Sequence, residues 1–264
     1  MSAAAANGVL GQFGITAPAG FVLVLARVSP LFVLAPLFSS RQVPPRVRTV
    51  VAVALAIGLT PLALRGHAIP HDALLIAGLA LKELLVGLAF ALSLGVLFAA
   101  INSAGALLDM LVGFSFGSLV DPLTGNQSAV LAQLYSLVAV AVFVAIDGDA
   151  WVVQGLARTF DFVPVTGAPD VTSLAQGVTA VFTTIFASAL EVAAPVLLAV
   201  VITDVAFGVV SRVVPQLNVF AVGFPVKVVV GLLVVAASLP FAAGWISDQL
   251  SASVGQALQV VKVS

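Results

Sequence analysis

Six long apolar runs, separated by short polar segments, constrain the fold of this chain more than any other feature. They cover residues 21–38, 47–64, 73–100, 128–146, 178–210 and 219–245. Most of them reach the ~20 residues that an α-helix needs to cross ~30 Å of hydrocarbon. Strands of a membrane barrel would instead be ~10-residue segments that alternate in polarity. The sequence therefore predicts an all-α integral membrane-complex protein with about six hydrophobic helical regions.

The composition excludes a soluble protein with a charged surface. Of the 264 residues, 61% are hydrophobic and 8% are charged, against roughly 25% charged residues in an average soluble domain. Such a chain needs lipid, other subunits, or both around it. The formal net charge of −1 offers no positive field for nucleic acid. The absence of cysteine excludes disulfides, thiolate nucleophiles and zinc–sulfur sites.

Two of the runs are too long for one comfortable membrane crossing. At 1.5 Å per residue, 73–100 would span ~42 Å and 178–210 ~50 Å, so each is expected to be a bent helix or a hairpin. Pro195 favours a break in the second. Arg41, Arg46 and Arg48 place the loop after the first run in the cytoplasm and the N-terminus outside. Because residues 1–20 contain no Lys or Arg, we expect no cleaved signal peptide.

Charged side chains inside the apolar runs are expected to have a specific role. Besides Arg48 at the very start of the second run, they are Arg27, Lys82, Glu83, Glu191, Asp204 and Lys227. At roughly 3 kcal/mol each, exposing all of them to lipid would cost on the order of 18 kcal/mol, more than a typical total stability. They are either contacts between subunits or a polar pathway such as a proton relay, and the balanced signs favour contacts. Lys82 and Glu83 are not expected to pair simply with each other, since adjacent helical residues point about 100° apart, so each is expected to find a partner on another helix or another chain.

The sequence gives little support for a catalytic site or a metal site. His67 and His71 have the i, i+4 spacing of a metal pair, but Pro70 between them favours a solvated loop. No arrangement offers a nucleophile, a base and a stabiliser together. The glycines at 113 and 117 lack the Gly-Lys-Ser/Thr pattern of a phosphate loop. We therefore expect no enzyme and no cofactor.

The segment 107–122 combines bulky apolar residues with glycines, which makes it a poor helix and a poor surface loop. The residues of interest are Leu111, Gly113, Phe114, Phe116, Gly117 and Asp121. Exposed to water, the apolar side chains would form an aggregation-prone patch. The segment is therefore either a buried or re-entrant loop, or a hydrophobic constriction that closes a lumen by excluding water. Glycine would permit movement on opening.

The chain resembles the FliR family of flagellar biosynthetic proteins, whose relatives in virulence secretion systems are called SctT. The resemblance covers nearly the whole length and is carried by the order of short motifs. These are Ala-Arg-Val-Ser-Pro at 26–30, the segment 36–48, Lys-Glu at 82–83, Gly87, Gly105, Asp109, Gly-Phe at 113–114, Asp-Pro at 121–122, Pro195, Asp204, Gly208, the segment 212–220, and Gly-Phe-Pro-Val-Lys at 223–227. One departure is Asp-Gly-Asp at 147–149, where the family commonly has Asn-Gly-His.

The resemblance implies a subunit of the type III protein export gate in the bacterial inner membrane, built of bent helical hairpins around a channel for unfolded exported proteins. The implied partners are FliP-like and FliQ-like subunits, with FlhB-like and FlhA-like proteins nearby. A FliP-like part would cover residues 1–175 and a FliQ-like part residues 176–264. About 107–121 would be the plug of the closed channel, and the charges in the apolar runs would be mostly contacts between subunits.

A self-sufficient secondary transporter of small solutes is the alternative function. Six helical regions and buried charges would allow it. It predicts a polar pocket at mid-membrane and inverted repeats, and no clear repeat is visible in the sequence. Whether the exported proteins serve a flagellum or a virulence needle stays open.

Overall fold

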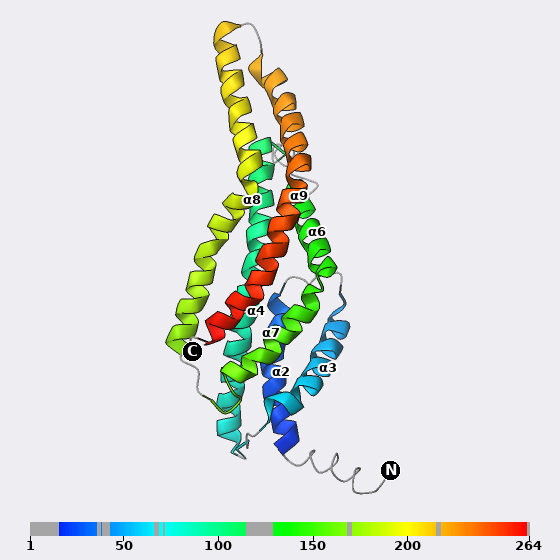
Figure 1. The fold of residues 1–264 in the computed structure, drawn as a ribbon, viewed down its shortest axis with the longest axis vertical. Coiled ribbons are helices and arrows are strands. Elements are labelled where there is room, and N and C mark those ends of the chain that lie inside the picture. Colours follow the sequence, from blue (N-terminus) through cyan, green and yellow to red (C-terminus); the bar gives the residue numbers. More distant parts are fainter. Residues whose placement is uncertain are drawn as a thin grey trace, which may run out of the picture. The chain divides into compact units, whose positions relative to one another are not determined.

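The computed structural model describes residues 16–35, 38, 43–65, 69–70, 72–114, 129–167, 171–214 and 218–262. These residues form seven helices and no strand, in agreement with the predicted all-α class (Figure 1). The helices are α2 (Thr16–Leu34), α3 (Pro45–Ala63), α4 (Ala73–Val112), α6 (Val130–Ala145), α7 (Gly148–Phe162), α8 (Val171–Val213) and α9 (Val219–Lys262).

The two longest predicted runs are single helices. α4 has 40 residues and α8 has 43, so the hairpin alternative for 73–100 and 178–210 is wrong. α8 continues through Pro195, because one missing backbone donor leaves the hydrogen bonds on either side in place. α4 also includes residues 107–112, which were expected to be poor helix. Apolar side chains dominate both helices and outweigh the cost of the unfavourable residues.

Helix α7 lies where the sequence suggested only a connection. Its buried residues Val152, Gly155, Leu156, Thr159 and Phe160 recur every three or four positions. That spacing gives a helix one buried face without a continuous apolar run. The short amphipathic pattern was missed because only long runs were counted.

By length and composition, α3, α4, α8 and α9 could each cross a membrane. A short break separates α6 from α7, and the two helices would make a fifth span if they are counted together as one membrane crossing. α2 is apolar but shorter over Pro18–Leu34. All six hydrophobic regions are thus helical, and four of the helices are long enough to span hydrocarbon singly.

The contacts divide the chain into two units, and the first comprises residues 1–95, 149–182 and 252–264. Within it, Leu23, Val24 and Val28 of α2 are fully buried. α2 and α4 approach so closely that a Cβ on Gly87 would lie 2.1 Å from the Arg27 carbonyl oxygen. Only glycine fits there, and the close approach brings the charged residues of the two helices together.

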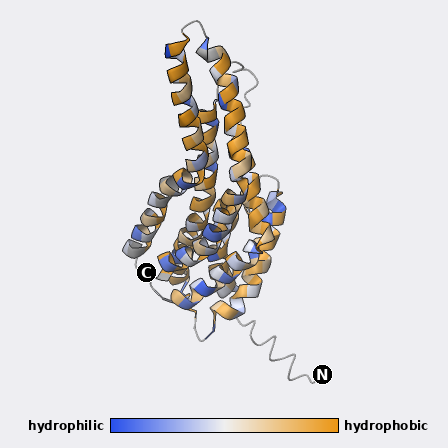
Figure 2. Cartoon of the chain, turned by 45° about the horizontal axis from the view of Figure 1, so that its top comes forward, coloured by the Kyte–Doolittle hydropathy of each residue, from blue (hydrophilic) through white to orange (hydrophobic). Residues whose placement is uncertain are grey.

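The second unit comprises residues 96–148 and 183–251. Here α4 and α6 touch at Gly105, where a Cβ would lie 2.3 Å from the Ala132 Cα atom. α8 and α9 run antiparallel beside each other (Figure 1). Figure 2 shows that hydrophobic residues cover most of these two helices in that view. The two units do not coincide with the division expected at 175/176, which concerns likeness to two kinds of subunit and stays a prediction.

Candidate functional site

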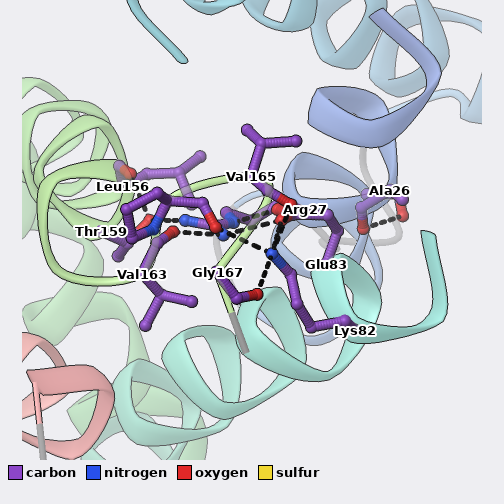
Figure 3. Close-up of polar contacts among 11 residues, drawn as sticks. Ala26, Arg27, Lys82, Glu83, Leu156, Thr159, Val163, Val165 and Gly167 are labelled. Atoms are coloured by element: carbon purple, nitrogen blue, oxygen red, sulfur yellow. Dashed lines mark hydrogen bonds and ion pairs between the residues drawn. The ribbon is translucent and has the colours of Figure 1, made fainter. Parts of the chain in front are cut away.

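A buried charged cluster joins α2, α4 and α7 in the first unit. Arg27 of α2 and Glu83 of α4 are both 0% exposed. The guanidinium of Arg27 donates from Nε to Oε2 of Glu83 and from Nη2 to Oε1 over 2.9 Å (Figure 3). Two parallel hydrogen bonds of this kind are among the strongest that side chains make.

The rest of the Arg27 guanidinium is directed at α7. Nη1 lies 3.3 Å from the Thr159 hydroxyl, and Nη2 also donates to the Val163 carbonyl over 2.8 Å. The guanidinium carbon lies 4.1 Å from the centre of the Phe160 ring. Arginine is suited to such a place because its planar fork carries five donors and its face can stack on an aromatic ring.

Lys82 completes the cluster by holding the turn after α7. Its ammonium donates to the carbonyls of Pro164 at 2.8 Å, Val165 at 2.6 Å and Gly167 at 3.1 Å. It also lies 2.7 Å from Glu83 Oε1, so the expectation that these neighbours do not pair with each other is wrong. The flexible four-carbon stem of lysine carries the ammonium well away from the direction of its Cβ, so it lies beside the Glu83 carboxylate while it donates to the carbonyls after α7.

The two cations of the cluster lie close to the C-terminal end of α7, where they interact favourably with backbone carbonyl oxygens. α7 ends at Phe162, and its last backbone carbonyls carry the partial negative charge of the helix dipole. Arg27 and Lys82 place two cations against the carbonyls that follow. With one carboxylate between them, the cluster carries a formal charge of +1, which the carbonyl oxygens partly offset. The arrangement fixes α2, α4 and the turn 163–167 as one piece.

A second ion pair links α8 and α9 in the second unit. Lys227 Nζ lies 2.7 Å from Asp204 Oδ2, and the two side chains are 22% and 53% exposed. Glu191, also on α8, is exposed and forms no ion pair with any residue that the structure describes. Partners for Arg27, Lys82, Glu83, Asp204 and Lys227 therefore lie within the chain. A role of the six charges in contacts between subunits or in a pathway stays a prediction.

The predicted plug is only partly within the described residues. Leu111 lies half-buried in the last turn of α4, and Gly113 ends the helix with its N–H donating to the Asp109 carbonyl over 3.1 Å. Gly113 has φ +105°, which side chains rarely adopt, and its Cβ position lies 2.6 Å from the Phe224 ring. Phe114 follows in a turn. Phe116, Gly117 and Asp121 lie outside the described residues, as do His67 and His71.

Asp109 is a structural residue to which sequence reasoning assigned no role. Its carboxylate, 3% exposed, accepts hydrogen bonds from the backbone N–H of Leu131 at 3.0 Å and of Ala132 at 3.1 Å. These are free donors in the first turn of α6, which no side chain of its own caps. The sequence signal that could have identified this role is an acid in an apolar segment, Asp109, followed by a glycine at the end of the helix, Gly113. The described residues contain no group of three or more potential metal ligands.

Comparison with known proteins gives consistent matches over most of the chain. Residues 19–253 match the family described as bacterial export proteins, family 1. The flagellar biosynthetic protein FliR of Escherichia coli K12 is 31% identical over 219 residues, 83% of this chain and 84% of that protein. FliR of Bacillus subtilis 168 is 34% identical over 226 residues, 84% of this chain and 87% of the relative. The surface presentation of antigens protein SpaR of Shigella sonnei is 24% identical over 215 residues, 80% and 82% of the two chains.

Proposed function

The chain belongs to the bacterial export proteins of family 1, and from this premise we propose that it is a structural and gating subunit of a type III protein export gate. The observation that carries the proposal is the family match over residues 19–253, supported by the relatives FliR and SpaR, which align over most of their own length. Its place is the bacterial inner membrane, where it is a multi-pass protein and works in an export complex with other subunits.

A self-sufficient solute transporter is the less favoured function. The relatives are named flagellar biosynthetic protein FliR and surface presentation of antigens protein SpaR, and the family is described as export proteins. The exposed apolar helices also suit a subunit that buries its surface on neighbours as well as on lipid. The proposed function needs no catalysis, and we propose no enzymatic role.

The partners that we propose are FliP-like and FliQ-like subunits, with FlhB-like and FlhA-like proteins nearby and unfolded exported proteins as cargo. In this arrangement residues 1–175 correspond to a FliP-like part and residues 176–264 to a FliQ-like part. The start of α3, which carries Arg46 and Arg48, faces the cytoplasm. Gating is assigned to the segment 107–121, whose described part ends at the glycine turn after α4.

The buried cluster suits a gating subunit because it holds part of the chain rigid. A gate that moves needs a rigid part against which it can move, and the Arg27–Glu83–Lys82 cluster joins α2, α4 and the turn after α7 through charged hydrogen bonds. Breaking a buried charge cluster of this kind is costly, because removal of the shared acid Glu83 leaves two cations without a partner acid. The cluster therefore favours one arrangement of these helices over alternatives.

Purification of the affinity-tagged chain from its native membrane tests the proposal. We expect FliP-like and FliQ-like proteins to be recovered with it, and we expect deletion of the chain to stop export. A chain that is recovered alone, and whose deletion leaves export intact, would refute the function.

Removal of single charges at Asp204 and Lys227 distinguishes a role in contacts between subunits from a role in a proton relay. Contacts between subunits predict reduced recovery of partners, whereas a relay predicts intact assembly with export that no longer responds to proton-motive force.

A further inference from the structure

Glu191 lies on the outer face of α8, among exposed apolar residues. The opposite face of the helix is buried within the chain through Ala189, Val192, Ala193, Val196 and Val200. The face that carries Glu191 also presents Ala187, Ala194 and Leu198, all of them exposed, with Leu198 at 60%. A carboxylate in the middle of such a face is costly against hydrocarbon, so a polar partner is required.

Because of Pro195, the backbone carbonyl of Glu191 is a second hydrogen-bond acceptor close to the Glu191 carboxylate. In an α-helix the N–H of residue 195 would donate to the carbonyl of residue 191. Proline has no N–H, so the Glu191 carbonyl lacks this helical donor. Glu191 therefore offers a carboxylate and a backbone carbonyl within one turn of the helix. Two neighbouring acceptors match the several N–H donors of a lysine or arginine head group.

The three cations in the interior of the apolar runs already have acidic partners within the chain. Arg27 and Lys82 share Glu83, and Lys227 pairs with Asp204. Asp204 is thirteen positions from Glu191, about 20 Å along the helix, so Lys227 cannot serve both acids. A second copy of the chain would bring the same engaged cations. In a two-fold contact through this face it would also place one Glu191 near the other.

We propose that the α8 face centred on Glu191 docks an apolar helix of a different subunit, and that this helix carries a lysine or arginine that binds the Glu191 carboxylate and carbonyl. Ala187 and Ala194 are small enough to let the partner backbone approach closely. The apolar remainder of the face fits a partner helix of equally low polarity. The inference rests on the proposed function, since it requires a complex with other subunits.

Photo-crosslinking in the assembled complex tests the identity of the occupant. A photoreactive residue replaces Ala187 in one variant and Ala194 in another, and the crosslinked peptides are sequenced. We expect an apolar helix of another subunit with a Lys or Arg within about one turn of the crosslink. A partner helix without a basic residue, a second copy of this chain, or crosslinks to lipid alone would each overturn the inference.

Charge reversal gives an independent readout. Glu191→Lys should lower recovery of the partner by about tenfold or more, because cutting a hydrogen-bonded charge pair weakens an interface at least that much. Exchange of the partner's basic residue for Glu should restore recovery of the Glu191→Lys variant. The control Asp161→Lys, an exposed acid on α7, should leave recovery unchanged. Unchanged recovery in Glu191→Lys, or no rescue, refutes the docking inference while normal export leaves the proposed function standing.

Discussion

Glu83 of α4 binds the guanidinium of Arg27 from α2 through both carboxylate oxygens, and neither side chain is exposed to solvent. The same carboxylate also faces the ammonium of Lys82. One acid thus serves two cations, so the members of the cluster differ in what their loss leaves behind. Loss of Arg27 leaves a Glu83–Lys82 pair, whereas loss of Glu83 leaves two buried cations without an acid.

Glu83→Gln should therefore destabilise the protein more than Arg27→Met. Breaking a buried pair by removing one partner costs about 3–5 kcal/mol, and the Glu83 variant should lie at the upper end of that range. Thermal unfolding of the purified protein in detergent measures the order. Arg158→Met, which removes an exposed cation of α7, is the control and should have little effect. The reverse order would show that the contacts of Arg27 with Thr159, Phe160 and Val163, not the shared carboxylate, dominate.

Lys82→Met should loosen the turn 163–167 more than Lys82→Arg. The ammonium satisfies the carbonyls of Pro164, Val165 and Gly167, and methionine keeps the stem but removes every donor. Because the chain has no cysteine, Val165→Cys provides a single buried reporter. We expect this cysteine to react with a maleimide faster in the Lys82→Met background than in the parent.

The exposed neighbour Thr166 provides the control for that measurement. A cysteine at this position should react at similar rates in both backgrounds, which separates loosening of the turn from a change in reagent access or thiol reactivity. Equal labelling rates at position 165 with and without Lys82 would contradict the assigned role.

Asp109→Ala should weaken the start of α6. The Asp109 carboxylate accepts from the Leu131 and Ala132 amides, and loss of such a cap commonly costs about 0.5–2 kcal/mol. Hydrogen exchange of these two amides should accelerate, whereas amides in the middle of α6 should change less. Asp109→Asn keeps one acceptor and should lie between the parent and the alanine variant. Unaltered exchange at Leu131 would argue against the cap.

The sequence predicted the helical class and the positions of the hydrophobic helices because long apolar runs without periodic polarity have few other solutions. It did not predict α7, whose buried positions such as Val152 and Leu156 are spaced as in any short amphipathic helix. It identified Arg27, Lys82 and Glu83 as costly to expose to lipid and therefore in need of polar partners. Their mutual pairing depends on how α2 crosses α4 at Gly87, a tertiary contact that residue type and spacing do not encode.

The glycine turn after α4 gives a test of the predicted plug. Gly113→Ala should be poorly tolerated, because φ +105° is strained for alanine and the added Cβ would lie 2.6 Å from the Phe224 ring. Gly78, near the start of α4 and with open space around its Cβ position, is the control, and Gly78→Ala should assemble normally. Recovery of the complex from membranes measures both variants, and normal recovery of Gly113→Ala would show that the turn is free to rearrange.

Sealing by the phenylalanines of the same segment is a separate prediction. If Phe114 and Phe116 help to close the resting channel, replacing both with alanine removes the bulk that excludes water, while the glycine turn is left unchanged. Ion leakage across the membrane should then rise in cells whose complex assembles to the parental level. The double substitution Leu74→Ala and Leu75→Ala, at exposed apolar positions near the start of α4, is the control for loss of apolar bulk and should not raise leakage. Unchanged leakage in the phenylalanine variant, with assembly intact, would count against the plug.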